Sequence, residues 1–211
     1  MRTKLLFVFS HIGERTGEHM EQDQTVEKAN PIKNEVWEWI KALLIAAALV
    51  FFIRWLIFAP FIVEGPSMEP NFHTGERLIV NKLTYRFGNP ERGEVLVFHA
   101  TKDKDYIKRV IALPGEKVRV EGDQVYVNGQ LLDEPYLKQA LDEAAKQGIP
   151  YNTRNYPEQT VPEGSIFVMG DNRSNSSDSR DSTVGFVKYE QIVGRADLIF
   201  WPFDKISLVH F

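Results

Sequence analysis

The sequence contains no cysteine among its 211 residues. Disulfide bonds, thiolate nucleophiles and cysteine-ligated zinc are therefore excluded. No pair of histidines has the spacing of metal ligands, so we expect no metal site and no cofactor. Acidic residues outnumber basic ones only slightly, 29 against 25, and both kinds are spread along the chain. Because this leaves no basic face for a phosphate backbone, we expect no nucleic-acid partner.

Charge is nearly absent from one long apolar run, residues 42–63, which carries only Arg54. At a rise of about 1.5 Å per residue, this run reaches the ~30 Å thickness of a bilayer's hydrocarbon core. Pro60 is expected to end the helix. We predict a transmembrane helix at 37–60. A buried core helix is the alternative, because the charge-free part, 42–53, is short.

The residues before this helix, 1–36, are polar and mixed in charge, which is typical of a leader without a fold of its own. Met20 lies within them and is followed by a short polar stretch that leads into the apolar run. We therefore expect residues 1–19 to be dispensable and Met20 to be able to serve as the start.

Residues 61–211 contain short β-branched runs separated by turn residues, a pattern that predicts a mainly β domain. The predicted strands are 77–80, 94–98, 106–113, 117–120, 124–127, 165–169 and 192–201. An insertion is expected near 134–163. Helical spacing of apolar residues predicts a helix at 136–147, and three prolines predict an irregular connection at 149–163.

Three polar segments of this domain could carry chemistry. Ser67 lies on a Pro- and Gly-rich turn just after the apolar run. Lys108 shares one face of a predicted strand with Tyr106 and Val110, so burial would lower its pKa towards the range of a general base. Segment 170–180 alternates acids with arginines, which suits ion pairs that fix a loop. Taken singly, these segments favour a turn, a solvated lysine and a polar loop.

A Ser–His–Asp triad finds little support among the five histidines. His11 and His19 lie in the leader, and His210 lies at the end of the chain. His73 and His99 have no neighbouring acidic or nucleophilic motif. We therefore do not expect a charge-relay triad.

In this order, the segments resemble the bacterial type I signal peptidases, and most closely the single-anchor form typical of Gram-positive bacteria. The resemblance rests on an anchor followed by residues 65–70, 75–77, 92–98, 108–115 and 170–180. It implies a signal-peptidase/LexA-like β-rich catalytic domain, preceded by one transmembrane helix. It also implies a membrane-bound serine endopeptidase that removes N-terminal signal peptides from secreted preproteins.

The resemblance further implies roles for individual residues. Ser67 would be the nucleophile, and its backbone N–H would bind the oxyanion. Neutral Lys108 would be the general base, with its amine oriented by Ser176. The supporting ion pairs would be formed by Arg109 with Asp171 and by Asp178 with Arg180. Apolar pockets for small substrate residues would be lined by Phe61, Val63, Met68, Phe72, Tyr106 and Ile107.

At Gly65, some members of this family carry a serine whose hydroxyl helps to bind the oxyanion. We expect the substitution Gly65→Ser to raise turnover or leave it unchanged. Asn71 stands where threonine is usual, and we expect no effect on the chemistry.

The location also follows from the resemblance, because the basic residues flanking the anchor do not decide its orientation. Signal peptides are themselves inserted in the membrane, so Ser67 is expected near the outer interface. This implies a single-pass plasma-membrane protein with a cytoplasmic N-terminus and an extracellular catalytic domain. Its partners would be signal peptides of secretory preproteins and the lipid bilayer. This location also allows the protein-export machinery as a partner.

Two other classes of protein fit part of the sequence. A self-cleaving Ser/Lys repressor or mutagenesis protein would share the β-rich fold and the two reacting residues, but the membrane-spanning run argues against it. A membrane-tethered β domain without activity would act as an interaction module. Cleavage of a preprotein distinguishes these classes.

Overall fold

The computed structural model describes residues 31–209, so the leader and the possible start at Met20 lie outside the described residues. The described chain divides into one unit that ends at Leu44 and a second that begins at Ile45. All strands lie in the second unit.

Helix α1 (Pro31–Leu56) contains the first part of the apolar run, residues 42–56. Its window Glu35–Ile53 has a mean hydropathy of 2.0, and none of that window is buried. Among the described residues, α1 is the one helix that is long and apolar enough to cross a bilayer.

The end of α1 differs from the predicted interval 37–60, because the helix stops at Leu56 and Pro60 lies in strand β1 (Phe58–Ile62). A proline ring clashes with the carbonyl group four residues earlier, and the residue before a proline avoids the helical conformation. The chain after Leu56 therefore pairs with β2 instead of extending the helix.

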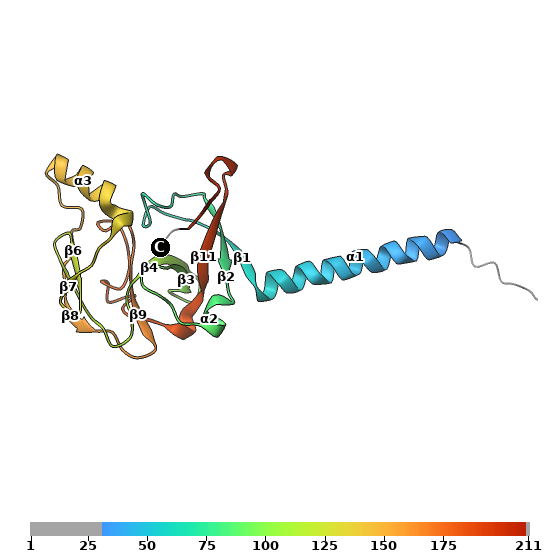
Figure 1. Cartoon of the computed structure of the whole chain (residues 1–211), viewed down its shortest axis with the longest axis horizontal. Coiled ribbons are helices and arrows are strands. Elements are labelled where there is room, and N and C mark those ends of the chain that lie inside the picture. Colours follow the sequence, from blue (N-terminus) through green and yellow to red (C-terminus); the bar gives the residue numbers. More distant parts are fainter. Residues whose placement is uncertain (1–30, 210–211) are drawn as a thin grey trace, which may run out of the picture. The chain divides into compact units, whose positions relative to one another are not determined.

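The larger sheet has eight strands, in the order β1-β2-β11-β3-β4-β9-β10, with β12 paired to β11. Its other members are β2 (Arg77–Asn81), β3 (Val95–His99), β4 (Asp105–Ala112), β9 (Ser165–Met169), β10 (Val187–Lys188), β11 (Ile192–Trp201) and β12 (Ser207–Leu208). Neighbouring strands run antiparallel, and β3, β4 and β11 lie near its middle (Figure 1). The mainly β prediction is confirmed.

A smaller sheet has the order β7-β6-β5-β8. It consists of β5 (Lys117–Glu121), β6 (Gln124–Val127), β7 (Gln130–Leu131) and β8 (Tyr156–Thr160). Strand β8 corrects the prediction that 149–163 is irregular throughout. Pro157 lies within β8, but β8 is an edge strand, where a missing backbone N–H need not interrupt the ladder.

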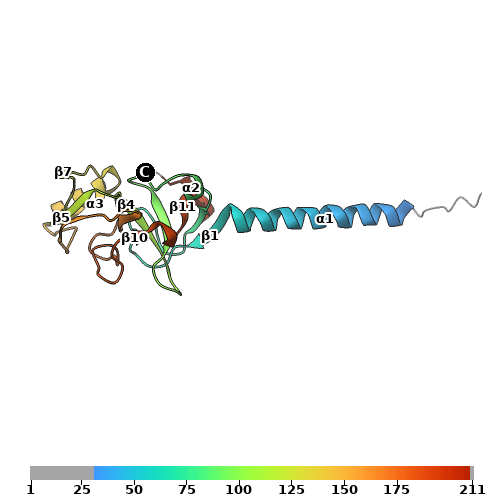
Figure 2. The ribbon, with the colours of Figure 1, turned by 90° about the horizontal axis from the view of Figure 1, so that it is seen from below.

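The helices that follow α1 are short. They are α2 (Thr84–Phe87), α3 (Lys138–Gln147) and the 3-10 helices η1 (Pro135–Leu137), η2 (Tyr189–Gln191) and η3 (Phe203–Lys205). Gly148 ends α3 in the left-handed conformation, with φ of 66°. Both views place α3 near the smaller sheet (Figures 1 and 2).

Two apolar clusters hold the two sheets together and fix the segment that carries Ser67. The first joins β4 and β9 of the larger sheet to β5 and β6 of the smaller one, with Phe167 and Val118 among its members. The second lies beneath the segment that carries Ser67 and includes Val63, Met68 and Phe72. Burial of such side chains is worth about 1.5–3 kcal/mol each, so this segment is held against the sheet.

Candidate active site

Ser67 lies on a turn directly before the buried Met68. Met68 is fully buried beneath the turn, and the backbone N–H of Glu69 donates to the carbonyl of Pro66 over 3.1 Å. Gly65 begins the turn with φ of 84°, a conformation that favours glycine. The local sequence therefore fixes the backbone on both sides of Ser67.

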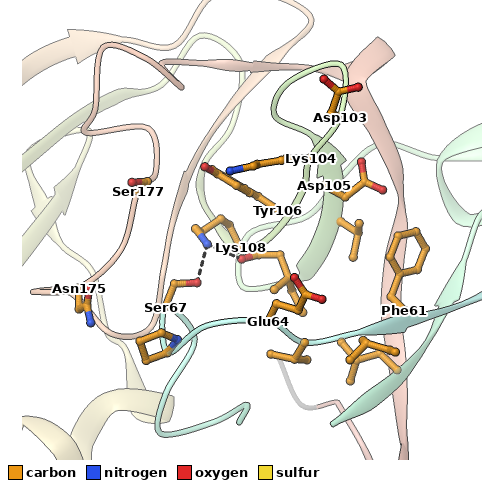
Figure 3. Close-up of a pocket in the computed structure, with 16 residues that line it drawn as sticks. Phe61, Glu64, Ser67, Asp103, Lys104, Asp105, Tyr106, Lys108, Asn175 and Ser177 are labelled. Carbon is orange, nitrogen blue, oxygen red and sulfur yellow. Dashed lines mark hydrogen bonds between the residues drawn. The ribbon is translucent and has the colours of Figure 1, made fainter. Parts of the chain in front are cut away.

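Lys108 lies on β4, which pairs with β3 on one side and with β9 on the other. Its Nζ donates 2.8 Å hydrogen bonds to the Ser67 hydroxyl and to the carbonyl of Ile107 (Figure 3). The lysine is only 3% exposed. Two residues 41 positions apart in the sequence thus share one hydrogen bond.

Burial lowers the pKa of Lys108 from 10.5 to about 8. The negative charges of Asp178 and Asp171 oppose this change, but desolvation outweighs them. A substantial fraction of the amine is therefore neutral near pH 8, and a neutral amine can accept a proton from the hydroxyl it contacts.

The loop after β9 supports this pair through buried charges. Arg109 holds Asp171 through two parallel bonds, Nε to Oδ1 at 2.9 Å and Nη2 to Oδ2 at 2.7 Å, and both side chains are almost fully buried. Arg180 holds Asp178 in the same way, over 2.8 and 2.7 Å. Burial alone would raise the pKa of Asp178, but the hydrogen bonds and charge of Arg180 hold it below its ordinary value.

Further partners of this loop come from the insertion, and no sequence motif predicts them. Arg173 forms a buried ion pair with Glu134, and Arg180 Nη1 donates to Asn152 Oδ1 over 2.6 Å. Arg154 donates to the carbonyl of Ser176. These partners lie 22 to 39 residues away in the sequence, so no local pattern could reveal them.

Asn172 and Asn71 also hold the site together. The backbone N–H of Asn172 donates to the carbonyl of Ser67, and its side chain donates to the carbonyl of Pro66, each over 3.1 Å. Asn71 Nδ2 donates to Asp171 Oδ2 over 2.8 Å. The loop after β9 is therefore bonded directly to the turn that carries the serine.

Ser176 is buried in this loop, where its hydroxyl helps to lower the pKa of Asp178. No hydrogen bond joins it to Lys108 in this structure. Its Oγ lies against Gly170, where an added Cβ would fall 2.2 Å from it and 2.4 Å from the Ser67 carbonyl oxygen. Gly170 thus permits a close approach that any side chain would prevent.

An open cavity of about 650 Å³ is lined in part by Ser67 and Lys108. Four of the six residues predicted to line the substrate pockets do line it: Phe61, Val63, Tyr106 and Ile107. Met68 and Phe72 do not, because they are buried in the apolar cluster behind Val63. Figure 3 shows the serine and the lysine at one side of this cavity, with Phe61 at the other.

In the described part of the chain, no three His, Cys, Asp or Glu side chains are grouped so that they could hold a metal ion. A hydroxyl bonded to a buried amine, beside an open cavity with apolar residues on part of its wall, defines a candidate serine hydrolase site that uses a lysine base.

Comparison with known proteins identifies the family. Residues 36–201 match the family described as signal peptidase, peptidase S26. The signal peptidase I of Bacillus amyloliquefaciens is 44% identical over 188 residues, which are 88% of this chain and 96% of that protein. Signal peptidase IB of Staphylococcus aureus (strain COL) is 40% identical over 185 residues, 83% of this chain and 95% of that protein.

A crystal structure of a signal peptidase I from Enterococcus faecalis V583 matches with a TM-score of 0.45 and 35% identity, covering 51% of this chain and 97% of that one. These sequence matches show that the chain belongs to the signal peptidase family, peptidase S26. The resemblance inferred from the motifs is confirmed.

Proposed function

We propose that this chain is a membrane-anchored signal peptidase I that cleaves signal peptides from preproteins with Ser67 as nucleophile and Lys108 as general base. The observation that carries the proposal is the 2.8 Å hydrogen bond from the amine of a buried lysine to a serine hydroxyl. Family membership supports the same activity.

In this mechanism, Ser67 Oγ attacks the scissile carbonyl carbon while its proton passes to Lys108 Nζ. The resulting ammonium protonates the departing amine as the C–N bond breaks, and an acyl-enzyme ester remains. Water then attacks the ester, again with Lys108 as base, and restores the serine. The backbone N–H of Ser67 is the proposed oxyanion donor, and one such donor is worth about 3–4 kcal/mol of transition-state stabilisation.

The remaining predicted residues take supporting roles. Ser176 would orient the amine when substrate is bound, since its hydroxyl is buried against Gly170, close to the Ser67 carbonyl. The buried pairs of Arg109 with Asp171 and of Arg180 with Asp178 would hold the loop. Apolar walls at Phe61, Val63 and Ile107 would select small substrate side chains by size.

For the membrane part, α1 would serve as the single anchor, with the N-terminus inside and residues 61–211 outside. The apolar window of α1 supports the anchor. The orientation rests on the substrate, because the cleavage sites of exported proteins emerge at the outer face.

The test uses the full chain in a neutral detergent and a purified preprotein. Cleavage at the signal peptide is expected from the wild type and is expected to be lost in Ser67→Ala. A matched control is Ser207→Ala, which removes an exposed hydroxyl on β12 and is expected to retain cleavage. Cleavage by Ser67→Ala at the wild-type rate would refute the proposal, and absence of cleavage by the wild type would favour an interaction module.

A further inference from the structure

A second cavity, of about 340 Å³, lies next to the turn that carries Ser67 and shares no lining residue with the first. Its walls come from Glu69 and Pro70 on the turn, from α3, and from the chain after α3. The lining includes Ala140 and Glu143 from α3, and Ile149 from the chain that follows.

The cavity is close to the reacting serine. Asn172 lines it and donates to the carbonyl groups of both Ser67 and Pro66. Glu69 is two residues beyond Ser67, a span of at most about 7 Å. An extended peptide advances about 3.3 Å per residue, so a chain that crosses Ser67 reaches this cavity within about two to three residues.

The first cavity indicates which part of the substrate would reach the second one, and this step rests on the proposed function. If the residues before the bond occupy the apolar groove beside Phe61 and Ile107, the residues after the bond leave Ser67 on another side. The second cavity is bounded by the turn residues that follow Ser67, which gives the departing chain a place to bind.

The lining also has a distinct charge. It contains two acidic side chains, Glu69 and Glu143, and no basic one. Cleavage creates a new α-amino group with an ordinary pKa of about 7.7–8.0, so much of it is cationic at neutral pH. Pro70, Ala140 and Ile149 add apolar surface for aliphatic side-chain stems.

We propose that this cavity binds the first residues of the mature chain and selects basic over acidic side chains there. The insertion that carries α3 would thus contribute specificity for the part of the substrate that is released. The acidic lining would also attract the new amino terminus until the product leaves.

The experiment uses paired peptides that are identical up to the cleaved bond and carry Lys or Glu at the third residue after it. The full-length enzyme is assayed in a neutral detergent, and the readout is the ratio of kcat/KM for the two peptides. We expect the Lys peptide to be favoured, and Glu143→Gln and Glu69→Gln each to reduce this ratio by about two- to fivefold at low salt. High salt should reduce the preference.

The matched control is Asp142→Asn, which removes the same charge from the neighbouring position of α3 but does not line this cavity. It is expected to leave the ratio at the wild-type value. A ratio that is unchanged in both glutamine variants, or that changes equally in Asp142→Asn, would overturn the proposal.

A third peptide separates this inference from the proposed function. It ends in a small ester leaving group and has no residue to place in the second cavity. If the wild type cleaves neither this peptide nor the longer ones, the proposed function fails. If the wild type cleaves all of them without regard to Lys or Glu, only the inference about the second cavity fails.

Discussion

Ser67 and Lys108 are joined by one hydrogen bond of 2.8 Å, whereas the loop after β9 is held by charged hydrogen bonds to residues far away in the sequence. Lys108 is buried without a carboxylate within salt-bridge distance among the described residues. Arg109 and Arg180 each hold a carboxylate through two bonds. The charged groups that support the loop are therefore paired with opposite charges. Within the described chain, Lys108 has no such partner, which favours its neutral form.

The two regions should therefore respond differently to substitution. Removing a reacting group should abolish chemistry without weakening the fold, because the fold does not depend on that group. Removing a supporting group should weaken the fold first, because its partner is left buried without compensation.

The largest expected effect is that of Lys108→Met. Loss of the general base should reduce kcat/KM by about 10²–10⁴-fold or more, and adding Ser67→Ala should reduce it little further, because the two residues act as a unit. Preprotein cleavage measures this effect. Activity of Lys108→Met near the wild-type value would break the contrast between reacting and supporting residues.

Lys108→Met should also unfold at a higher temperature than the wild type. The folded-state pKa of about 8 lies below the ordinary 10.5, so the folded protein binds fewer protons than the unfolded chain between these values. Stability therefore falls as the pH decreases from 10.5 to about 8, and at pH 7 the full penalty is about 3 kcal/mol. Methionine avoids this penalty, so a higher Tm at pH 7 is expected, whereas Lys117→Met, at an exposed lysine, should change the Tm little.

Asp171→Ala tests the supporting side. It would leave Arg109 buried without its carboxylate partner, and such losses cost about 3–5 kcal/mol. Thermal unfolding in neutral detergent measures the loss. Glu121→Ala, which removes one partner of an exposed pair with Arg119, should cost at most about 1 kcal/mol. Equal losses in the two variants would show that the buried pair is not a support.

Gly170→Ala should affect both regions, because the added Cβ would fall 2.4 Å from the Ser67 carbonyl oxygen and 2.2 Å from Ser176 Oγ. Overpacking of this kind costs about 1–3 kcal/mol, and a displaced nucleophile reduces the rate by about 10²-fold. The control Gly88→Ala places its nearest contact at 3.4 Å and should be tolerated. A fully active Gly170→Ala enzyme would contradict the close packing.

Gly65→Ser should have the smallest effect of these variants. The motif suggested a gain or no change, but the φ of 84° makes any L-residue strained there, although no atom lies within 4 Å of the added Cβ. We now expect a loss of about 1–3 kcal/mol and reduced turnover. Gly75→Ser, at φ of 92° and equally open, should lose similar stability while keeping more activity.

The sequence predicted the regular parts of the fold well. Strands 124–127, 165–169 and 192–201 match β6, β9 and β11, because alternating or continuous β-branched runs identify buried strands locally. Strand β8 is not predictable in this way, because Pro157 argues against a strand unless the strand lies at a sheet edge, and that position depends on the tertiary fold.

The site was predictable only in part. Motifs on the sequence selected Ser67, Lys108 and the pairs of Arg109 with Asp171 and Arg180 with Asp178, and the structure brings each pair into contact. The supports from Glu134, Asn152 and Arg154 depend on how the insertion packs against the loop, which no local spacing encodes. The catalytic roles stay predictions.

The pH dependence of kcat/KM for preprotein cleavage tests the central claim most directly, that Ser67 acts with a neutral lysine. Below about pH 8, the neutral fraction of Lys108 should rise about tenfold per pH unit. We therefore predict that kcat/KM increases with a slope near one up to about pH 8 and then levels off. If kcat/KM instead changes with an apparent pKa near the ordinary histidine value of about 6.5, or does not change between pH 6 and 9, Ser67 does not act with a neutral lysine.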